Sequence, residues 1–260
     1  MGRITIENMP WTQPAFAPLY PAESFPVITR ERWQVAVAFE TDYDFVQSVL
    51  PEGVDPASNP PVASVWCATH AHSTMGGPYR ESGAAVIVTF EGEQYVYPLV
   101  VYLGPNSEEW FAAGREVWGH QKKLGHSWIS EPEGSGVVTG YFERPQGSRL
   151  MEISVGPLER EARPDEIGFL KVLSLRVIPH PERPVAQLAE LIVTEADLTP
   201  RKGSDGRLEF WAGPGQVAYP VVSDRDPLYR LRVDRVIAGY YGCYEGIVTP
   251  FGKIAKQLIP

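Results

Sequence analysis

The chain has 260 residues, of which 43% are hydrophobic and 21% charged, and its formal net charge is −9. This length can bury a sizeable core, as one large domain or two small ones, and the composition is typical of a soluble globular protein. The negative charge, together with the lack of any basic run, argues against a nucleic-acid partner.

Cysteine and histidine are both sparse. Cys67 and Cys243 have no paired spacing, which argues against a disulfide framework or a zinc site and fits a reducing cytoplasm. His70 and His72 alternate along a predicted strand without a nearby third ligand, so we predict no metal and no cofactor. The N-terminus has no apolar signal segment and no stretch reaches the ~18 apolar residues of a membrane span. We therefore predict a cytoplasmic protein with no membrane segment.

The first part of the chain is rich in proline and aromatic residues up to about residue 30. We expect residues 1–30 to form an extended arm that lies across the surface or across a neighbouring subunit of a homo-oligomer. A valine-rich strand is predicted over 33–39, and a short helix over 42–50, capped by Thr41 or Asp42. Residues 61–71 are predicted to form the next strand.

Residues 83–90 and 95–103 form the clearest strand pair, and their near-continuous apolar character predicts burial on both faces. A helix is predicted to begin at 106–113, with Asn106 or Ser107 as its cap. Further strands are predicted at 125–130, 136–144, 148–155, 169–179 and 208–211, and a long strand region at 228–248. Residues 185–198 mix helical and strand patterns. Because no repeat or linker occurs, we predict one β-rich α+β domain over 1–260.

Two adjacent lysines, Lys122 and Lys123, follow the predicted second helix among apolar and small residues. In an extended segment, neighbouring side chains point to opposite faces, so one of the two must face the interior. A buried lysine without an acidic partner loses its charge readily, and a neutral amine is a nucleophile toward ketones. These two residues alone also allow a solvated lysine pair.

The run from Gly114 to Gly125 reads Gly-Arg-Glu, five residues, and then Lys-Lys-Leu-Gly. It resembles the signature of the acetoacetate decarboxylase-like superfamily. Glu81-Ser82-Gly83, and Arg32 followed by Thr41-Asp42 and Pro51-Glu52, are similar to two further segments of that superfamily. The resemblance covers roughly residues 14 to 260, and it implies a cone-like antiparallel β-barrel with a few outer helices.

The resemblance also implies roles for the two lysines. Lys122 would form a Schiff base with the ketone of the substrate, and Lys123 would tune this nucleophile. Burial among Trp118, Leu124 and Trp128 would lower the pKa of Lys122 by several units.

Two acids are further candidates. Glu81 begins the buried strand pair and could transfer a proton to an enamine, or it could be a strand-edge acid paired with Arg80. Glu116 lies six residues before Lys122. It is a candidate for substrate binding, although an acid beside Arg115 near a helix end more often forms a structural ion pair.

The sequence departs from the decarboxylase pattern at an expected arginine–glutamate pair. Arg32 is present, but the position of its glutamate partner falls near Val65-Trp66, and no acid occurs between Pro60 and Tyr79. We therefore expect the pair that would position a leaving carboxylate to be incomplete, unless Glu81 supplies the missing charge from the neighbouring strand.

A second departure is Gln121, which precedes the lysines where the decarboxylases have proline. Its amide can hydrogen-bond a substrate carboxylate or hydroxyl, provided that a twist or bulge turns it toward Lys122. Some superfamily members are pyruvate aldolase-dehydratases, which handle the substrate hydroxyl with tyrosines and an amide. Tyr241 and Tyr244 are candidates for this role, although buried strand tyrosines are also ordinary core residues.

Three functional hypotheses follow from these residues and the resemblance. In the first, a Schiff-base lyase condenses a small 2-keto acid such as pyruvate with an aldehyde and removes water, or catalyses the reverse. In the second, the same imine serves to decarboxylate acetoacetate or a related β-keto acid. In the third, a barrel binds a small ligand without chemistry.

Overall fold

The computed structural model describes residues 2–131, 134–163, 166 and 171–259. Strands dominate these residues, so the predicted β-rich α+β class is confirmed. The described helices are two α-helices, α1 (Tyr43–Ser48) and α2 (Glu108–Glu116), and two short 3-10 helices, η1 (Ala22–Ser24) and η2 (Leu228–Arg230). No helix in these ranges is long and apolar enough to cross a membrane.

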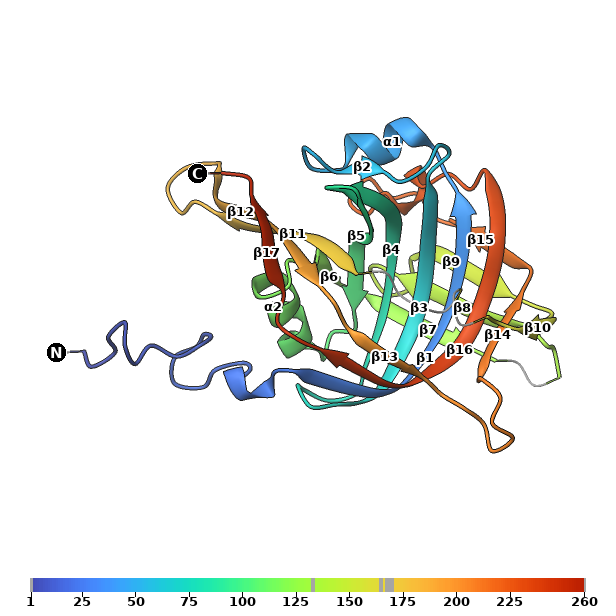
Figure 1. Ribbon diagram of the computed structural model, residues 1–260, viewed down its shortest axis with the longest axis horizontal. Helices are drawn as coiled ribbons and strands as arrows, with labels where there is room; N and C mark the ends of the chain where they lie inside the picture. Colours follow the sequence, from blue (N-terminus) through green and yellow to red (C-terminus); the bar gives the residue numbers. More distant parts are fainter. Residues whose placement is uncertain (1, 132–133, 164–165, 167–170, 260) are drawn as a thin grey trace.

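A large mixed sheet forms the centre of the molecule (Figure 1). Its neighbouring strands run in the order β10-β14-β16-β1-β3-β4-β5-β11-β12-β17, while β13 pairs with β16, β2 with β4, and β6 with β5. Its strands are β1 (Val27–Glu40), β2 (Asp55–Pro56), β3 (Val62–Ser73), β4 (Tyr79–Phe90), β5 (Glu93–Leu103), β6 (Lys122–Leu124), β10 (Arg160–Glu161), β11 (Val172–Pro179), β12 (Ala186–Thr194), β13 (Asp197–Pro200), β14 (Phe210–Gly213), β16 (Arg235–Thr249) and β17 (Lys253–Gln257).

The pairing of the large sheet is almost entirely antiparallel, but β6 and β11 each run parallel to β5. The end strands β10 and β17 do not pair with each other within the described ranges. The sheet is therefore open, where the resemblance implied a barrel.

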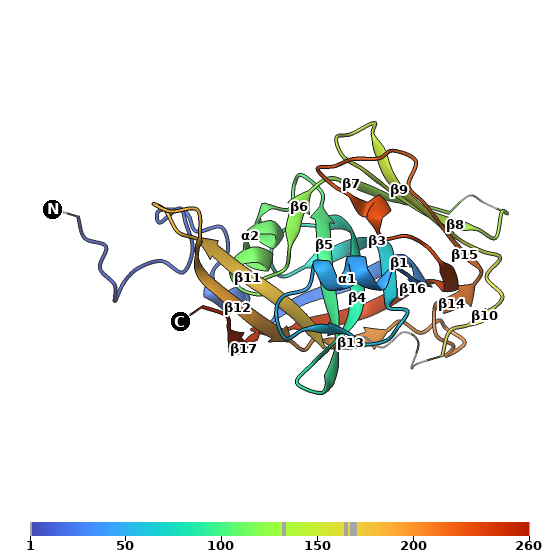
Figure 2. The ribbon, with the colours of Figure 1, turned by 90° about the horizontal axis from the view of Figure 1, so that it is seen from above.

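A small antiparallel sheet packs against one face of the large one. Its order is β15-β9-β8-β7, with β7 (His126–Ser130), β8 (Val138–Glu143), β9 (Arg149–Val155) and β15 (Gly215–Ala218). Figure 2 shows this sheet on one side of β1, β3 and β16, and β13 on the other side.

Alternation along the central strands creates the hydrophobic core between the two sheets. In β1, Val35, Val37 and Phe39 are fully buried on the face toward the small sheet, and Phe142 and Ile153 of the small sheet belong to the same cluster. The period of two places the residues between them on the opposite face. That opposite face carries the charged and polar residues described below.

Helix α2 packs on the large sheet through a second apolar cluster. Trp110, Ala113 and Trp118 are buried in it, together with Val101 and Leu103 of β5. Ser107 occupies the N-cap position, as predicted, but its hydroxyl donates to the carbonyl of Gly104 at 2.6 Å and caps no helix N–H. In α1, by contrast, the Asp42 carboxylate accepts from the Phe45 N–H at 2.7 Å, as expected of a cap.

Most predicted elements are present, with shifted ends. The ambiguous 185–198 region forms the strands β12 and β13, and β1 begins at Val27, inside the expected arm. The prediction of strand over 228–248 is wrong in its first part, because η2 lies there and β16 begins only at Arg235. Leu228 and Leu231 are both buried, and their spacing of three suits one 3-10 turn that buries the two side chains together. Residues 169–170 of the predicted 169–179 strand lie outside the described residues.

Candidate active site

The strand register brings a set of polar side chains to one face of the large sheet. Arg32 of β1 lies opposite His70 of β3, and the neighbouring row pairs Gln34 with Ala68 and Ala68 with Glu81 of β4. A third row runs from Trp66 through Gly83 and Val101 to Lys122. We call the surface formed by Arg32, Gln34, Ser64, Trp66 and Glu81 the polar face.

Lys122 lies at the edge of the polar face and is 4% exposed. Its amine donates to the carbonyl of Trp110 at 2.9 Å and lies 5.3 Å from the centre of the Trp110 ring. Burial lowers the pKa of Lys122 to about 8, an effect that the Glu81 carboxylate partly offsets. A substantial fraction of this amine is therefore neutral, and nucleophilic, near neutral pH.

The surroundings of Lys122 differ in part from the expected ones. Leu124 is exposed, whereas Trp118 and Trp110 are buried in the α2 cluster with ring centres 6.0 Å apart. Trp128 lies on β7, where it stacks against His126. Helix α2 supplies the apolar environment of the amine, and the predicted contribution of Leu124 is wrong.

Arg32 and Glu81 form an ion pair, with 2.9 Å between Nη2 of Arg32 and Oε1 of Glu81. Burial alone would raise the pKa of Glu81, but the Arg32 guanidinium and His70 outweigh it and hold the pKa well below its usual range. The prediction that Arg32 lacks an acidic partner is therefore wrong. The alternative pairing of Glu81 with Arg80 is also wrong, because Glu81 points toward Arg32.

His70 completes this cluster from β3. Its Nε2 is 3.6 Å from Oε1 of Glu81, and its ring stacks on Tyr79 with centres 4.1 Å apart. Burial lowers the pKa of His70 to about 4, although Glu81 opposes the shift. His70 is therefore neutral near pH 7, and Arg32 neutralises the Glu81 carboxylate.

A cavity of about 340 Å³ lies over the polar face. Lys122, His120, Glu81 and Arg32 line it together with Gln34, Ser64 and Trp66, and residues 195–198, which join β12 to β13 and begin β13, line another part of it. Its volume lies at the lower end of the range found for small-molecule sites. The nucleophilic amine, an ion pair and a row of polar groups thus line one cavity.

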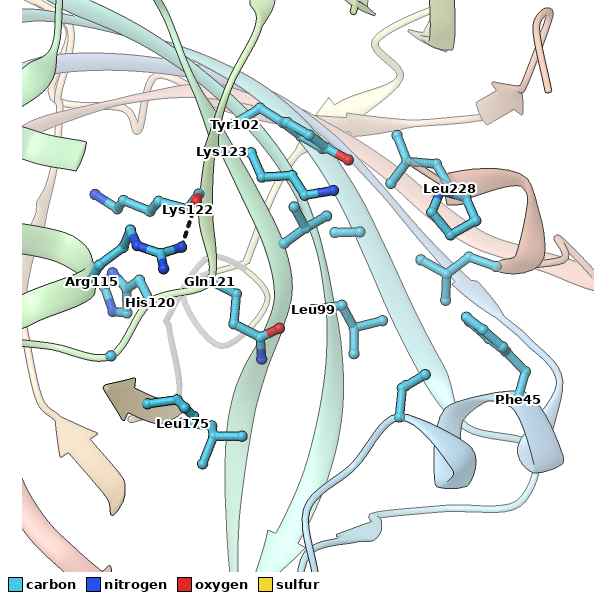
Figure 3. A pocket seen from close by; sticks show the side chains of 17 residues that line it. Phe45, Leu99, Tyr102, Arg115, His120, Gln121, Lys122, Lys123, Leu175 and Leu228 are labelled. Carbon is cyan, nitrogen blue, oxygen red and sulfur yellow. Dashed lines mark hydrogen bonds between the residues drawn. The ribbon is translucent and has the colours of Figure 1, made fainter. Parts of the chain in front are cut away.

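Lys123 points the opposite way, as the strand alternation predicted. Figure 3 shows the two amines directed to opposite sides of β6. The amine of Lys123 lies 2.7 Å from Oδ1 of the buried Asp226, which also pairs with Arg144 at 3.0 Å and accepts from the Tyr102 hydroxyl at 3.1 Å. Lys123 is therefore held in another ion-pair cluster, and the contacts do not support a role in tuning Lys122.

The amide of Gln121 also lies away from the polar face. It donates to the Tyr97 hydroxyl at 3.0 Å and lines a second, largely apolar cavity of about 490 Å³ (Figure 3). Lys123, Leu99 and Leu175 also line this cavity, and it shares Lys122 and His120 with the cavity over the polar face. Around Gln121, which the structure describes, the chain has no twist that turns this amide toward the Lys122 amine.

The remaining sequence candidates do not line the cavity over the polar face. Glu116 is exposed and accepts a hydrogen bond from the Tyr20 hydroxyl of the N-terminal arm at 2.6 Å, which is a structural role. Tyr241 hydrogen-bonds Glu131 and stacks on Trp33. Tyr244 lies opposite Arg32 in the β1–β16 register, but its ring packs against Phe210. We therefore do not assign Glu116, Tyr241 or Tyr244 to substrate binding.

Five residues of this site were not predicted from the sequence: Gln34, Trp66, His70, Ser64 and His120. A signal for the first three is the period of two in β1 and β3. Once Arg32 and Glu81 are placed on one face, Gln34, Trp66 and His70 must share it. His120 lies outside regular strand, so alternation could not have placed it.

Comparison with known proteins agrees with this fold. The profile of the acetoacetate decarboxylase (ADC) family matches residues 7–256. The chain belongs to this family. Acetoacetate decarboxylase 1 of Bradyrhizobium diazoefficiens is 30% identical over 217 residues, which cover 82% of this chain and 78% of that protein. The acetoacetate decarboxylase of Ralstonia nicotianae is 28% identical over 224 residues, with coverage of 82% and 81%.

Solved structures of the acetoacetate decarboxylase family share this fold. One acetoacetate decarboxylase superposes with a TM-score of 0.85 at 22% identity and covers 99% of this chain and 100% of its own. The enduracididine biosynthesis enzyme MppR, solved in complex with pyruvate, superposes with a TM-score of 0.75 at 18% identity and full coverage of both chains. An acetoacetate decarboxylase-like enzyme from Sphingomonas wittichii RW1 has a TM-score of 0.76 at 20% identity, with coverage of 96% and 100%.

Proposed function

We propose that this protein is a Schiff-base-forming lyase that acts on a small keto acid through Lys122. The observation that carries the proposal is the buried amine of Lys122, whose pKa is lowered to about 8 and which shares a cavity with the Arg32–Glu81 pair. The neutral amine attacks the ketone carbon, the carbinolamine loses water, and a protonated imine remains. Arg32, which is paired with Glu81, lines this cavity with its positive charge and can attract a substrate carboxylate, and the negative Glu81 stabilises the iminium charge.

The reaction that we propose first is aldol condensation of pyruvate with an aldehyde, followed by dehydration. Loss of a proton from the methyl group of the imine gives an enamine, whose carbon attacks the aldehyde carbon. The new hydroxyl leaves as water, and hydrolysis of the imine releases an unsaturated keto acid. The complex of the fold relative MppR with pyruvate supports this choice.

Decarboxylation of a β-keto acid is the second candidate, and the Arg32–Glu81 pair specifically favours it. The electrons of the bond to the carboxylate would flow into the same imine, carbon dioxide would leave, and protonation of the enamine carbon would precede hydrolysis. This route needs no base to remove a carbon-bound proton. Since Glu81 is strongly ion-paired, it is a weak base, and the proton transfer first suggested for it fits the aldol route less well.

Two assays on one protein sample separate these reactions. Condensation is followed by the absorbance of the conjugated product from pyruvate and an aromatic aldehyde, and decarboxylation by carbon dioxide release from acetoacetate. We expect condensation with slow carbon dioxide release. Fast release without condensation would make the decarboxylase the correct assignment. A failure of every keto acid to give a borohydride-stable adduct would favour a ligand-binding protein without chemistry.

A further inference from the structure

The cavity over the polar face contains polar atoms that the Schiff-base chemistry does not use. Nε1 of Trp66, Oε1 of Gln34 and Nε2 of His120 are all buried, and none has a hydrogen-bond partner among the residues that the structure describes. All three side chains line the cavity that Lys122 lines. A buried polar atom without a partner costs free energy, so several of them around one cavity point to a ligand that satisfies them.

The position of Trp66 ties these atoms to the reacting centre. Its ring lies over Gly83, where a Cβ atom would come within 2.5 Å of Cζ2 and 2.6 Å of Cη2 of the indole. Gly83 in turn pairs with Val101, and Val101 with Lys122. The indole therefore extends along the sheet toward the lysine, and only glycine at position 83 allows it to do so.

Gln34 stands next to this indole on the same face. Ala36 pairs with Trp66 across β1 and β3, so Gln34 is its diagonal neighbour, within reach of a large side chain. The indole N–H can only donate, whereas the free oxygen of the Gln34 amide can only accept. A hydroxyl group does both at once, because its oxygen accepts from Trp66 while its hydrogen is donated to Gln34.

We propose that Trp66, Gln34 and His120 form a subsite for a hydroxyl group of the substrate, so that the keto acid bound at Lys122 is a hydroxylated one. Nε2 of His120 adds a further contact to the same oxygen. This inference rests on the proposed function for the imine at Lys122, but the three polar atoms are independent of that lysine. Trp66 is then the residue that sets specificity.

A matched pair of ligands tests the subsite. Cyanoborohydride trapping with 4-hydroxy-2-oxopentanoate is compared with trapping of 2-oxopentanoate, which differs by the hydroxyl alone. The half-saturating concentrations are read from the total modified protein by intact mass, in which the hydroxylated, dehydrated and pyruvate adducts are summed. For the wild-type protein we expect the half-saturating concentration of the hydroxylated compound to be at least about tenfold lower than that of 2-oxopentanoate. The compound without the hydroxyl leaves the buried polar atoms of the subsite unpaired.

Two variants remove the proposed partners separately. Trp66→Phe keeps a ring over Gly83 but loses the N–H, and Gln34→Met keeps the length of the side chain but loses the amide. In each, the ratio of the two half-saturating concentrations should fall to within about threefold. Trp211→Phe, on β14 outside this cavity, is the control and should keep the wild-type ratio. Equal saturation in the wild type, or an unchanged ratio in both variants, would overturn the subsite.

Failure of the imine chemistry would be distinguishable from failure of the subsite. If neither keto acid gives an adduct with the wild-type protein, the proposed function fails. The subsite is then tested by calorimetric titration with 2,4-dihydroxypentanoate and 2-hydroxypentanoate, which contain no ketone. Tighter binding of the dihydroxy compound, lost in Trp66→Phe, supports the subsite, and equal binding contradicts it.

Discussion

Gly114 of helix α2 lies directly against the side chain of Lys122. A Cβ atom at position 114 would come within 2.3 Å of Cε and 2.7 Å of Nζ of the lysine. The side chain of Lys122 therefore occupies the space that a side chain at position 114 would fill. The Lys122 amine is held by its hydrogen bond to the Trp110 carbonyl. The glycine of the signature and its lysine form one structural unit.

Gly114→Ala should consequently impair imine formation without weakening the helix. Alanine is the better helix former by about 1 kcal/mol, so the fold gains local stability while the lysine is displaced. A misplacement of about 1 Å can cost on the order of a hundredfold in rate. Initial rates of reductive trapping measure the effect. Gly77→Ala, where a new Cβ meets nothing within 4 Å, is the control, and equal rates in both variants would contradict this role.

The pH dependence of trapping reports the lowered pKa of Lys122. Only the neutral amine attacks, so the rate should rise with pH and level off above about pH 8. An unperturbed lysine would instead give a midpoint near ~10.4. Lys123→Met should leave the midpoint in place, because Lys123 pairs with Asp226 on the other side of β6. If Lys123→Met shifts the midpoint of the pH profile, Lys123 does tune the pKa of Lys122.

Burial of Lys122 should cost stability, and Lys122→Met should recover it. The folded state lowers the pKa, so the charged amine opposes folding below about pH 8, and the penalty fades as pH rises toward the unfolded value. At about 1.4 kcal/mol per pKa unit, the variant should gain on the order of 3 kcal/mol in the free energy of unfolding at pH 7.

Urea unfolding at pH 7 and pH 10 measures this gain, which should be smaller at pH 10. Lys253→Met, at an exposed position on β17, is the matched control and should change little at either pH. A loss of stability in Lys122→Met at both pH values would mean that the amine stabilises the fold.

Glu81→Gln should destabilise the protein, because it leaves the Arg32 guanidinium buried without its carboxylate. Breaking a buried pair in this way costs about 3–5 kcal/mol, whereas an exposed pair contributes about 1 kcal/mol or less. Glu152→Gln breaks the more exposed Arg149–Glu152 pair, which has a similar distance of 2.9 Å. Chemical denaturation of both variants should separate them clearly. Similar losses would show that the Arg32–Glu81 pair contributes little.

The alternation of side chains in the sequence predicted the strands and the opposite directions of the Lys122 and Lys123 side chains. Both depend on the period of two along an extended chain. The ion pair between Arg32 and Glu81 could not be predicted in the same way. The two residues lie on β1 and β4, and β3 stands between them, so their contact depends on the register of three strands. The sequence therefore indicates Glu81 only as an alternative source of the missing charge, and the expected acid near Val65-Trp66 is absent.

Tyr241 and Tyr244 show the opposite error. A run of tyrosines suggested hydroxyl groups for the site, but β16 pairs with the far side of β1 and packs these rings against Trp33 and Phe210. The sequence of a long strand does not predict which strand will pair with it. The space that Gly114 leaves for Lys122 could not be predicted from the sequence either, because it depends on how α2 packs against β6.

The central claim is that Lys122 is the covalent nucleophile, and peptide mapping after reductive trapping tests it most directly. The protein is incubated with pyruvate and cyanoborohydride at about pH 8, digested, and the modified lysine located by mass spectrometry. We expect the adduct on Lys122, none on Lys123, and none in Lys122→Arg, because the guanidinium stays protonated and does not form the imine. An adduct on Lys123, or an equal yield from Lys122→Arg, would contradict the account.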